Sequence, residues 1–352
     1  METIKIGEVC DILNGFAFKS ENYVESGIRV IRIANVQKGY IEDSAPAFYP
    51  IDSEGLDKYM LESGDLLMSL TGNVGRVALL ADEFLPAALN QRVACLRMKD
   101  DRISKRYLFH ILNSDYFEQK CIQSSKGVAQ KNMSTEWLKE YEVPLYSESE
   151  QAEIVSVLDR TRSIISSREQ ELEKLDELIK ARFVEMFGDP IRNTNCRETT
   201  DFINVVKMQR GFDLPVQDRQ RDGGIPVYGS NGVLDCHDTA KVYGGGIITG
   251  RSGTIGKVYY TDKDFWPLNT TLFSVDTHGN NVIFLAYLLD LYDLSRFTEG
   301  TGVPTLNRNK FHNKQVITVS LEEQNEFASF AKQVDKSKFV AKEKVNVMYH
   351  YS

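Results

Sequence analysis

The longest regular pattern of apolar and polar positions lies between Ser147 and Gly188 and predicts one continuous helix. Apolar residues recur there at alternating steps of four and three, and neither proline nor glycine occurs before Gly188. Ser147 and Glu150 form an S-x-x-E capping box, and Gly188-Asp189-Pro190 is a typical helix end. Roughly 40 residues at about 1.5 Å each give a rod of about 60 Å. That length favours a spacer between domains, although a core or dimerising helix would show the same pattern.

A second, weaker helical pattern lies between about Leu321 and Val347. Its roughly 26 residues correspond to about 39 Å, and Ser320 with Glu323 forms a capping box at its head. Residues 337–338 interrupt its apolar seam. Because such a seam is buried against another helix, we expect the two helices to pair. The positions expected to form this contact are Ile154, Leu158, Ile165, Leu172, Leu175, Ile179, Met186, Phe327, Phe330 and Val334.

The segments before and after the long helix carry the same short patterns in the same order, which indicates an internal repeat. Each contains a strand pattern, a Gly-x-x-Gly turn with a following basic residue, and a second strand, at 66–77 and at 246–258. The last match is the Glu-Gln pair at the head of each helix, Glu150-Gln151 and Glu323-Gln324. The remaining matches are Asn14-Gly15-Phe16 with Arg210-Gly211-Phe212, Asn90-Gln91-Arg92 with Asn269-Thr270-Thr271, and 127–132 with 302–307.

Each repeated segment is predicted to mix strands and helices. Short β-branched or aromatic runs such as 29–33 and 272–275 predict strands. Apolar residues at helical spacing in 105–120 and 282–294 predict helices. The polar stretch 189–200 is predicted to link the long helix to the second segment.

Composition points to a folded, soluble protein, with 42% hydrophobic and 26% charged residues. The N-terminus lacks the pattern of a signal peptide and no apolar run is long enough to span a membrane, so we expect a cytoplasmic protein. The five scattered cysteines favour reduced thiols over disulfides or a zinc site. A net charge of −8 argues against strong unaided binding to DNA, although a local basic face decides such binding.

Two glycine-rich stretches resemble cofactor loops at first sight, and neither fits. Five residues separate Gly250 from Gly256, where a P-loop has four, and Val258 stands where Ser or Thr would hold magnesium. The run 243–246 faintly resembles a methyl-donor loop, but no Asn-Pro-Pro-Tyr-like motif accompanies it. No acidic cluster with a nearby lysine forms a convincing nuclease pattern. We therefore predict that the chain has no active site, metal or cofactor of its own.

Taken together, these features resemble the specificity (S) subunit of a type I DNA restriction-modification system. The resemblance covers nearly the whole chain. It depends on the twofold repeat, the Glu-Gln pairs, the Gly-x-x-Gly-basic turns and the FVEMFGDP segment at 183–190. It implies an α+β fold, in which two repeated mixed α/β target-recognition domains are separated by long helices that form an antiparallel coiled coil. The second helix departs from the family, whose two helices commonly have similar lengths.

The resemblance also implies a division of the chain. Target-recognition domains are expected at 1–147 and 201–319, the spacer helix at 148–188, a linker at 189–200, and a C-terminal helix at 320–352 that pairs with the spacer.

In this family each target-recognition domain reads one half of a split, asymmetric site in double-stranded DNA. The helices set the spacing and dock methyltransferase (M) subunits, expected to number two, and restriction (R) subunits. S-adenosylmethionine, ATP and Mg are then expected in those partners, and no membrane is involved. The alternative function is a coiled-coil scaffold or adaptor that makes no contact with DNA.

The candidate DNA contacts lie at matched places in the two repeats. Basic residues beside glycine turns suit phosphates, and polar side chains in turns suit base edges. The candidates are Thr71, Asn73, Arg76, Asn90, Gln91, Arg92, Gln130, Lys131, Asn132, Tyr228, Ser230, Asn231, Arg251, Ser252, Thr254, Lys257, Asn269, Thr270, Thr271, Thr305, Asn307 and Arg308.

Overall fold

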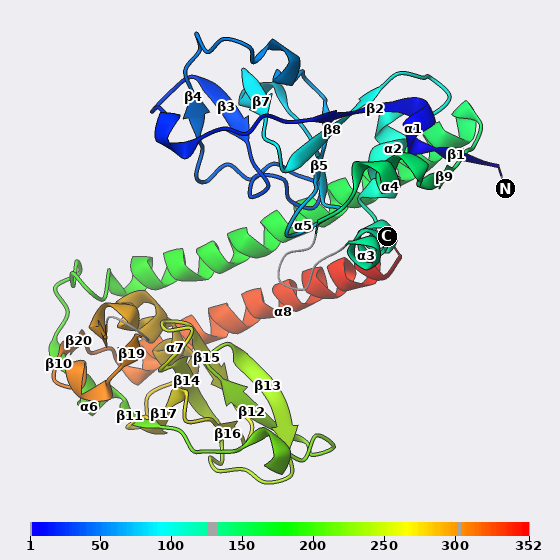
Figure 1. Ribbon diagram of the computed structural model, residues 1–352. Helices are drawn as coiled ribbons and strands as arrows, with labels where there is room; N and C mark the ends of the chain where they lie inside the picture. The colour runs from blue at the N-terminus through cyan, green and yellow to red at the C-terminus, as the bar shows by residue number, and fades with distance from the viewer. Residues whose placement is uncertain (1, 126–131, 301–303, 352) are drawn as a thin grey trace. The chain divides into compact units, whose positions relative to one another are not determined.

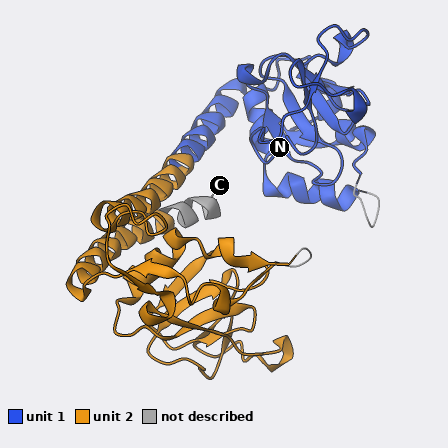
Figure 2. Ribbon diagram, turned by 90° about the vertical axis from the view of Figure 1, so that its left-hand side faces the viewer, with its two compact units in different colours: residues 1–164, 352 blue, residues 165–351 orange. Residues whose placement is uncertain are grey.

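The computed structural model describes residues 2–125, 132–300 and 304–351, with side chains described as far as Glu343 (Figure 1). The chain divides into two compact units, Met1–Ile164 and Ile165–Tyr351 (Figure 2). Each unit contains both sheets and helices, as the sequence predicts.

The first unit consists of two sheets, a short strand pair and a group of helices. A four-stranded sheet has the order β2-β8-β5-β6, a three-stranded sheet has the order β4-β3-β7, and β1 pairs with β9. The strands are β1 (Thr3–Lys5), β2 (Cys10–Asn14), β3 (Ile28–Ile31), β4 (Phe48–Tyr49), β5 (Leu66–Ser69), β6 (Val77–Leu79), β7 (Ala87–Leu89), β8 (Val93–Met98) and β9 (Glu142–Pro144). The helices are α1 (Ile6–Val9), α2 (Lys105–Leu112), α3 (Asp115–Ser124), α4 (Thr135–Glu140) and the first part of α5 (Glu148–Phe187).

Side chains on the two faces of the four-stranded sheet belong to two separate cores. Leu66 and Met68 of β5 belong to a core that also contains Leu108 of α2. Leu67, between them, belongs to a second core with Leu89 of the three-stranded sheet. Because successive residues of a strand point to opposite faces, one strand packs against a helix layer on one side and a sheet on the other.

The second unit repeats this architecture. Its sheets have the orders β11-β17-β14-β15 and β13-β12-β16, and β10 pairs with β20. The strands are β10 (Thr199–Asp201), β11 (Lys207–Arg210), β12 (Ile225–Gly229), β13 (Gly232–His237), β14 (Gly246–Gly250), β15 (Val258–Thr261), β16 (Trp266–Pro267), β17 (Thr271–Asp276), β18 (Thr298–Glu299), β19 (Thr305–Leu306) and β20 (Gln315–Ile317). The helices are α6 (Phe202–Val205), α7 (Val282–Tyr292), the last part of α5, and α8 (Leu321–Tyr351).

The predicted internal repeat is confirmed by this topology. Each strand of the first unit's three sheets has a counterpart in the same place in the second unit. The cores also correspond, since Ile247 of β14 belongs to one core with Phe284 of α7, whereas Ile248 belongs to another with Phe265.

Two of the predicted matches between the repeats have the wrong register. The carbonyl oxygen of Arg92 accepts a hydrogen bond from the turn after β5 (3.0 Å), and that of Thr270 accepts one from the turn after β14 (2.8 Å). Arg92 therefore corresponds to Thr270, so the match of 90–92 with 269–271 is wrong by one residue. Thr271 is the first residue of β17 and not part of the turn.

The match of 127–132 with 302–307 is wrong by two residues. Asn132 forms a β-bridge with Thr71 in the first unit, and Thr305 forms the equivalent bridge with Ser252 in the second. Asn132 therefore corresponds to Thr305. Both segments are short and mostly polar in sequence, so several registers of similar quality were possible.

Both predicted long helices are present. The backbone N–H of Ser147 donates to Glu150 Oε2 (2.9 Å), as expected for a capping box, and Gly188 has a φ of +83° where α5 ends. Helix α8 has 31 residues and ends at Tyr351, so the predicted end near Val347 was too early. The residues thought to interrupt it are accommodated, because Lys338 pairs with Asp176.

Within the second unit, α8 contacts the last part of α5 in antiparallel order. Phe183 packs on Phe327 with ring centroids 5.3 Å apart, Arg182 contacts Glu326 (3.2 Å), and farther from this end Asp176 contacts Lys338. Of the predicted pairing positions, the buried ones are Ile165, Ile179, Phe327 and Val334, and the half-buried ones are Ile154, Leu158, Leu172, Leu175, Met186 and Phe330. In the described part of the chain, no helix is long and apolar enough to cross a membrane.

Candidate nucleic-acid interface

In the second unit, turns that are far apart in sequence are hydrogen-bonded to one another. The backbone N–H groups of Arg251 and Ser252, after β14, donate to the carbonyl oxygen of Thr270, before β17, at 2.8 and 3.2 Å. The N–H of Leu306, in β19, donates to the carbonyl oxygen of Arg251 (2.8 Å). A Cβ placed on Gly253 would lie 3.3 Å from Ser230 Oγ, so the β12–β13 turn adjoins the same place. Many of the predicted contacts of this unit are thereby brought together.

The glycines of the two Gly-x-x-Gly turns all have left-handed φ angles. Gly253 and Gly256 have φ values of +81° and +94°, and Gly72 and Gly75 have values of +70° and +83°. L-residues with side chains rarely adopt such angles, so glycine is needed at all four positions. Exposed turns of this kind can direct backbone N–H groups toward an anion.

A groove of about 500 Å³ lies beside these turns in the second unit. Its polar residues include the predicted contacts Ser230, Asn231, Asn269 and Thr270, and Asn269 donates to Asp213. Val233 and Leu234, on the same groove, are 59% and 62% exposed. Sequence reasoning missed both, because no local pattern separates an exposed apolar pair in a strand from a buried one. The remaining lining residues are Leu214, Pro215, Arg219, Gly229, Gly232 and Leu268.

The candidate cations Lys257 and Arg251 of the second unit remain available for phosphates. Lys257 is exposed and Arg251 is half-buried, and neither side chain pairs with any other residue that the structure describes. By contrast, Arg219 in the groove is bound to Asp235 (3.4 Å). Thr254 and Arg308 are half-buried, and exposed Asn307 caps a short helical turn by accepting a hydrogen bond from the Asn309 N–H (3.1 Å), so its oxygen is engaged.

The first unit brings the equivalent turns together. Leu70 donates to the carbonyl oxygen of Arg92 (3.0 Å), and Met133 donates to that of Leu70 (2.9 Å). Asn73, Gln91, Arg92 and Asn132 are exposed, whereas Thr71 and Asn90 are half-buried. Thr71 Oγ1 is buried and has no hydrogen-bond partner among the described residues. Gln130 and Lys131 lie outside the described residues.

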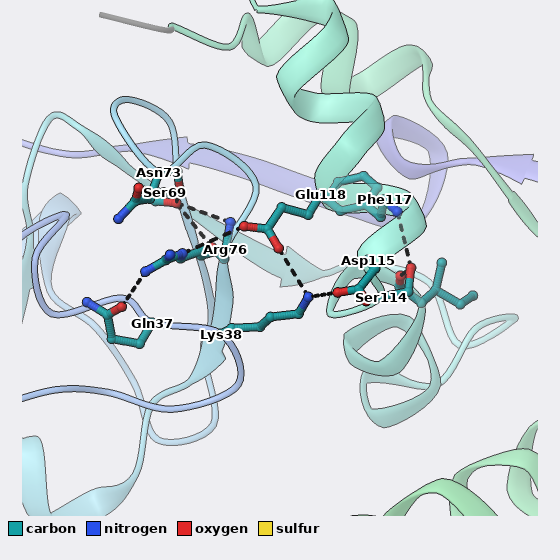
Figure 3. A network of polar contacts seen from close by, with 10 residues as sticks. Gln37, Lys38, Ser69, Asn73, Arg76, Ser114, Asp115, Phe117 and Glu118 are labelled. Atoms are coloured by element: carbon teal, nitrogen blue, oxygen red, sulfur yellow. Dashed lines mark hydrogen bonds and ion pairs between the residues drawn. The ribbon is translucent and has the colours of Figure 1, made fainter. Parts of the chain in front are cut away.

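Arg76 is held within the first unit and does not point freely toward solvent (Figure 3). Its Nη1 donates to Gln37 Oε1 (2.5 Å), and its Nε lies 3.7 Å from Glu118 Oε1 at the start of α3. Glu118 also pairs with Lys38 (3.1 Å), which in turn pairs with Asp115. Arg76, a candidate phosphate ligand, thus already has a polar partner in Gln37 and an acidic one in Glu118, which it shares with Lys38.

Two further predicted contacts are buried in the core. The side chain of Tyr228 is 8% exposed and packs edge-on against Phe265, with ring centroids 5.7 Å apart. Thr271 is fully buried, and its hydroxyl donates to the carbonyl oxygen of Leu268 (2.7 Å). Thr271 is removed from the set of candidate DNA contacts because it does not reach the surface, and little of the Tyr228 side chain is left exposed for such a contact.

The structure defines a class of protein: two mixed α/β units of the same topology, on a chain whose long helices begin at matched capping boxes. The sequence profile of the family described as "Type I restriction modification DNA specificity domain" matches twice, over residues 1–177 and 194–347. The chain therefore belongs to this family. Among the described residues, no group of three or more His, Cys, Asp or Glu side chains could hold a metal ion.

Two curated relatives are named as specificity subunits of type I restriction enzymes. The chain is 31% identical over 186 residues to the type I restriction enzyme MjaVIII specificity subunit of Methanocaldococcus jannaschii, a match that covers 51% of this chain and 43% of that protein. It is 28% identical over 202 residues to the EcoBI specificity subunit of Escherichia coli, covering 57% and 40%. The chain thus spans less than half the length of these relatives in each match.

Solved structures share the fold over the whole chain. The S subunit of a type I restriction-modification system from M. genitalium superposes with a TM-score of 0.61 at 14% identity, covering 99% of this chain and 93% of that one. A chain from a study of assembly and conformational transition of the type I restriction-modification system gives a TM-score of 0.55 at 15% identity, covering 99% and 95%.

Proposed function

We propose that this chain is the non-catalytic, DNA-reading subunit of a type I restriction-modification complex, and that each unit reads one half of a split, asymmetric site. The observation that carries this proposal is the convergence of the same turns at the same place in two units whose matching sheets have the same strand order. Those turns bear different polar side chains, with Gln91 and Arg92 where the second unit has Asn269 and Thr270. Two units with equivalent backbones and different polar side chains are suited to recognise two different DNA sequences.

The chemistry of the turns fits both parts of DNA recognition. Lys257 and Arg251 in the second unit and Arg92 in the first can neutralise phosphates, which supplies affinity without sequence preference. Asn231, exposed on the groove, and Gln91 carry amides of the kind that bind adenine through two hydrogen bonds. The exposed apolar pair on the same groove can contact a thymine methyl group.

The long helices are proposed to set the spacing of the two half-sites as an antiparallel coiled coil. The antiparallel contacts of α8 with α5 in the second unit support this. About 60 Å of helix corresponds to somewhat under two turns of DNA. Two methyltransferase subunits and the restriction subunits would dock on the complex in the cytoplasm, and would bring S-adenosylmethionine, ATP and Mg with them.

Exchange of one unit tests this function. Replacing residues 1–147 with the matching unit of a relative, and mapping the adenines methylated by the complex with its M subunits, should change one half-site and leave the other unchanged. A change in both halves would refute the modular assignment.

A gel-shift experiment with the same complex separates this function from that of a scaffold. We expect one DNA sequence to be bound in preference to shuffled DNA. Equal binding of both, or no binding, would favour a scaffold without DNA contact.

A further inference from the structure

Each long helix carries a buried glutamine at its fourth residue. Gln151 of α5 is 3% exposed and Gln324 of α8 is 1% exposed, although both helices are largely polar at this end. Buried amides are costly unless they are hydrogen-bonded, so each of these side chains needs a compensating set of partners. The Glu-Gln pairs stand out in the sequence, but the capping box explains only the glutamate.

Each glutamine has three hydrogen-bond partners, and two of the three are the same in kind and place in both units. Gln151 Oε1 accepts from the backbone N–H of Ser104 (2.8 Å), and its Nε2 donates to the carbonyl oxygens of Arg102 (2.8 Å) and Tyr146 (2.9 Å). Ser104 caps the N-terminus of α2, accepting a hydrogen bond from the Tyr107 N–H. The glutamine thus joins the first turn of the long helix to the cap of the helix beside it.

The second unit repeats this arrangement. Gln324 Oε1 accepts from the backbone N–H of Asn281 (2.8 Å), and its Nε2 donates to Asn280 Oδ1 (2.7 Å) and to the carbonyl oxygen of Val319 (2.9 Å). Asn281 caps α7 as Ser104 caps α2. Both units therefore hold the first turn of a long helix by three hydrogen bonds to one glutamine, and differ only in the third acceptor, which is a backbone carbonyl in the first unit and the Asn280 side chain in the second.

Such a contact fixes more than apolar packing can. Hydrogen bonds weaken steeply with distance and angle, so three of them on one amide allow a single placement of the helix. A shift of one residue moves a helix by about 1.5 Å and about 100°. It would leave the amide and the capping N–H buried without partners, at about 1–3 kcal/mol for each group.

We propose that Gln151 and Gln324 are positioning residues, which fix the axial position and rotation of each long helix against its own unit and thereby determine how strictly the spacing of the two DNA half-sites is read. The inference rests on the proposed function. The length of the long helices can define the spacing of the half-sites only if each unit is attached to its helix in one position. The glutamines would provide that fixed attachment. Because DNA turns by roughly 35° per base pair, a loosened rotation at one head would admit neighbouring spacings.

The experiment uses the full chain assembled with its M subunits. A pool of DNA carries the native half-sites at the native spacing and at spacings one base pair shorter and longer, and methylation of each is counted by sequencing. In Gln151→Met, which keeps length and removes the three hydrogen bonds, we expect the preference for the native spacing to fall about fivefold to tenfold. The bases recognised in each half-site should not change.

The matched control is Glu150→Ala, one residue away. It removes the capping box, which also destabilises the helix head by about 1 kcal/mol, but leaves the glutamine contacts in place. We expect its spacing preference to equal that of the unchanged chain. If Gln151→Met and Glu150→Ala show the same undiminished preference, the glutamine is merely structural and the inference is overturned.

Two further variants keep the inference testable if Gln151→Met does not assemble. Gln151→Glu keeps the acceptor for Ser104 and removes both donors, and Gln324→Met tests the second head; an unchanged spacing preference in either contradicts the inference. If the unchanged complex methylates no split sequence, the proposed function fails. If the complex methylates a split sequence and neither glutamine variant changes the spacing preference, only the positioning role is refuted.

Discussion

The aromatic cluster at the end of α5 allows a quantitative test of how the second unit is held together. Phe183 is fully buried, and its ring centroid lies 4.9 Å from Phe187, 5.6 Å from Phe284 and 5.3 Å from Phe327. Replacing a buried phenylalanine with alanine costs about 3–5 kcal/mol through lost apolar contact and the cavity left behind. Phe183→Ala should therefore remove a large share of a stability that is typically about 5–15 kcal/mol.

The two tryptophans of the chain make the effect measurable in each unit separately. Trp137 lies in α4 of the first unit and Trp266 lies in β16 of the second. In a Trp137→Phe background, the fluorescence of Trp266 reports unfolding of the second unit alone, and Trp266→Phe gives the converse. For a unit of this size, a loss of about 4 kcal/mol lowers the Tm by about 8–16 °C.

The expected result is a large shift reported by Trp266 and little or none reported by Trp137. Val184→Ala is the matched control, because this neighbour on α5 is 41% exposed and should shift the Tm by far less. Equal shifts from both reporters would show that the units unfold together. A shift from Phe183→Ala no larger than that of the control would refute the assignment of this ring to the core.

Three further perturbations follow from single contacts. Glu118→Gln removes the carboxylate beside Arg76, so the complex with M subunits should bind random DNA more tightly. The slope of log affinity against log salt concentration should become steeper by about one. An unchanged slope would contradict the idea that Glu118 offsets the charge of Arg76. Burial lowers the pKa of His312, whose Nε2 accepts a backbone hydrogen bond (3.2 Å). Stability should therefore decrease as the pH falls below about 6.5, where the unfolded chain takes up the proton. His312→Gln should flatten this pH dependence of stability, and an equal slope in both proteins would refute the role of His312. Gly211→Ala places a Cβ 2.2 Å from a main-chain oxygen, so it should lower the free energy of unfolding, measured in denaturant, by about 1–3 kcal/mol. Gly224→Ala is the control, because the space around Gly224 is open. Equal losses of stability in the two variants would argue against the close approach at Gly211.

The helices and the repeat were predictable because their signals are local. A capping box, a heptad pattern and a terminal glycine all lie within the helix that they define. The predicted pairing positions nevertheless omitted Phe183 and Phe187, which are fully buried. A strict alternation of four and three fits 3.5 residues per turn, and a straight helix has 3.6, so the buried stripe drifts toward steps of four, from Ile179 to those two rings.

The candidate site was predictable in its turns and not in its individual side chains. The glycines marked the turns correctly, but Tyr228 and Thr271 lie in strands whose two faces are both covered. Such strands lack the polar alternation that would reveal which residues face solvent. The partner of Arg76 could not be predicted, because Glu118 comes from a helix 42 residues later and only the fold brings the two together. For the same reason Gln151 was visible as a motif while its partner Ser104 was not.

The short strand pairs at the ends of each unit bear on how such genes can change. Ile4 pairs with Val143 in the first unit, and Thr200 pairs with Val316 in the second. In each unit, the segment that contains the sheets therefore begins and ends on two adjacent antiparallel strands. A crossover between two genes at these points would transplant a closed cassette without cutting a sheet in half. An exchange at these points would thus carry all the strands of one unit together and leave the long helices unchanged.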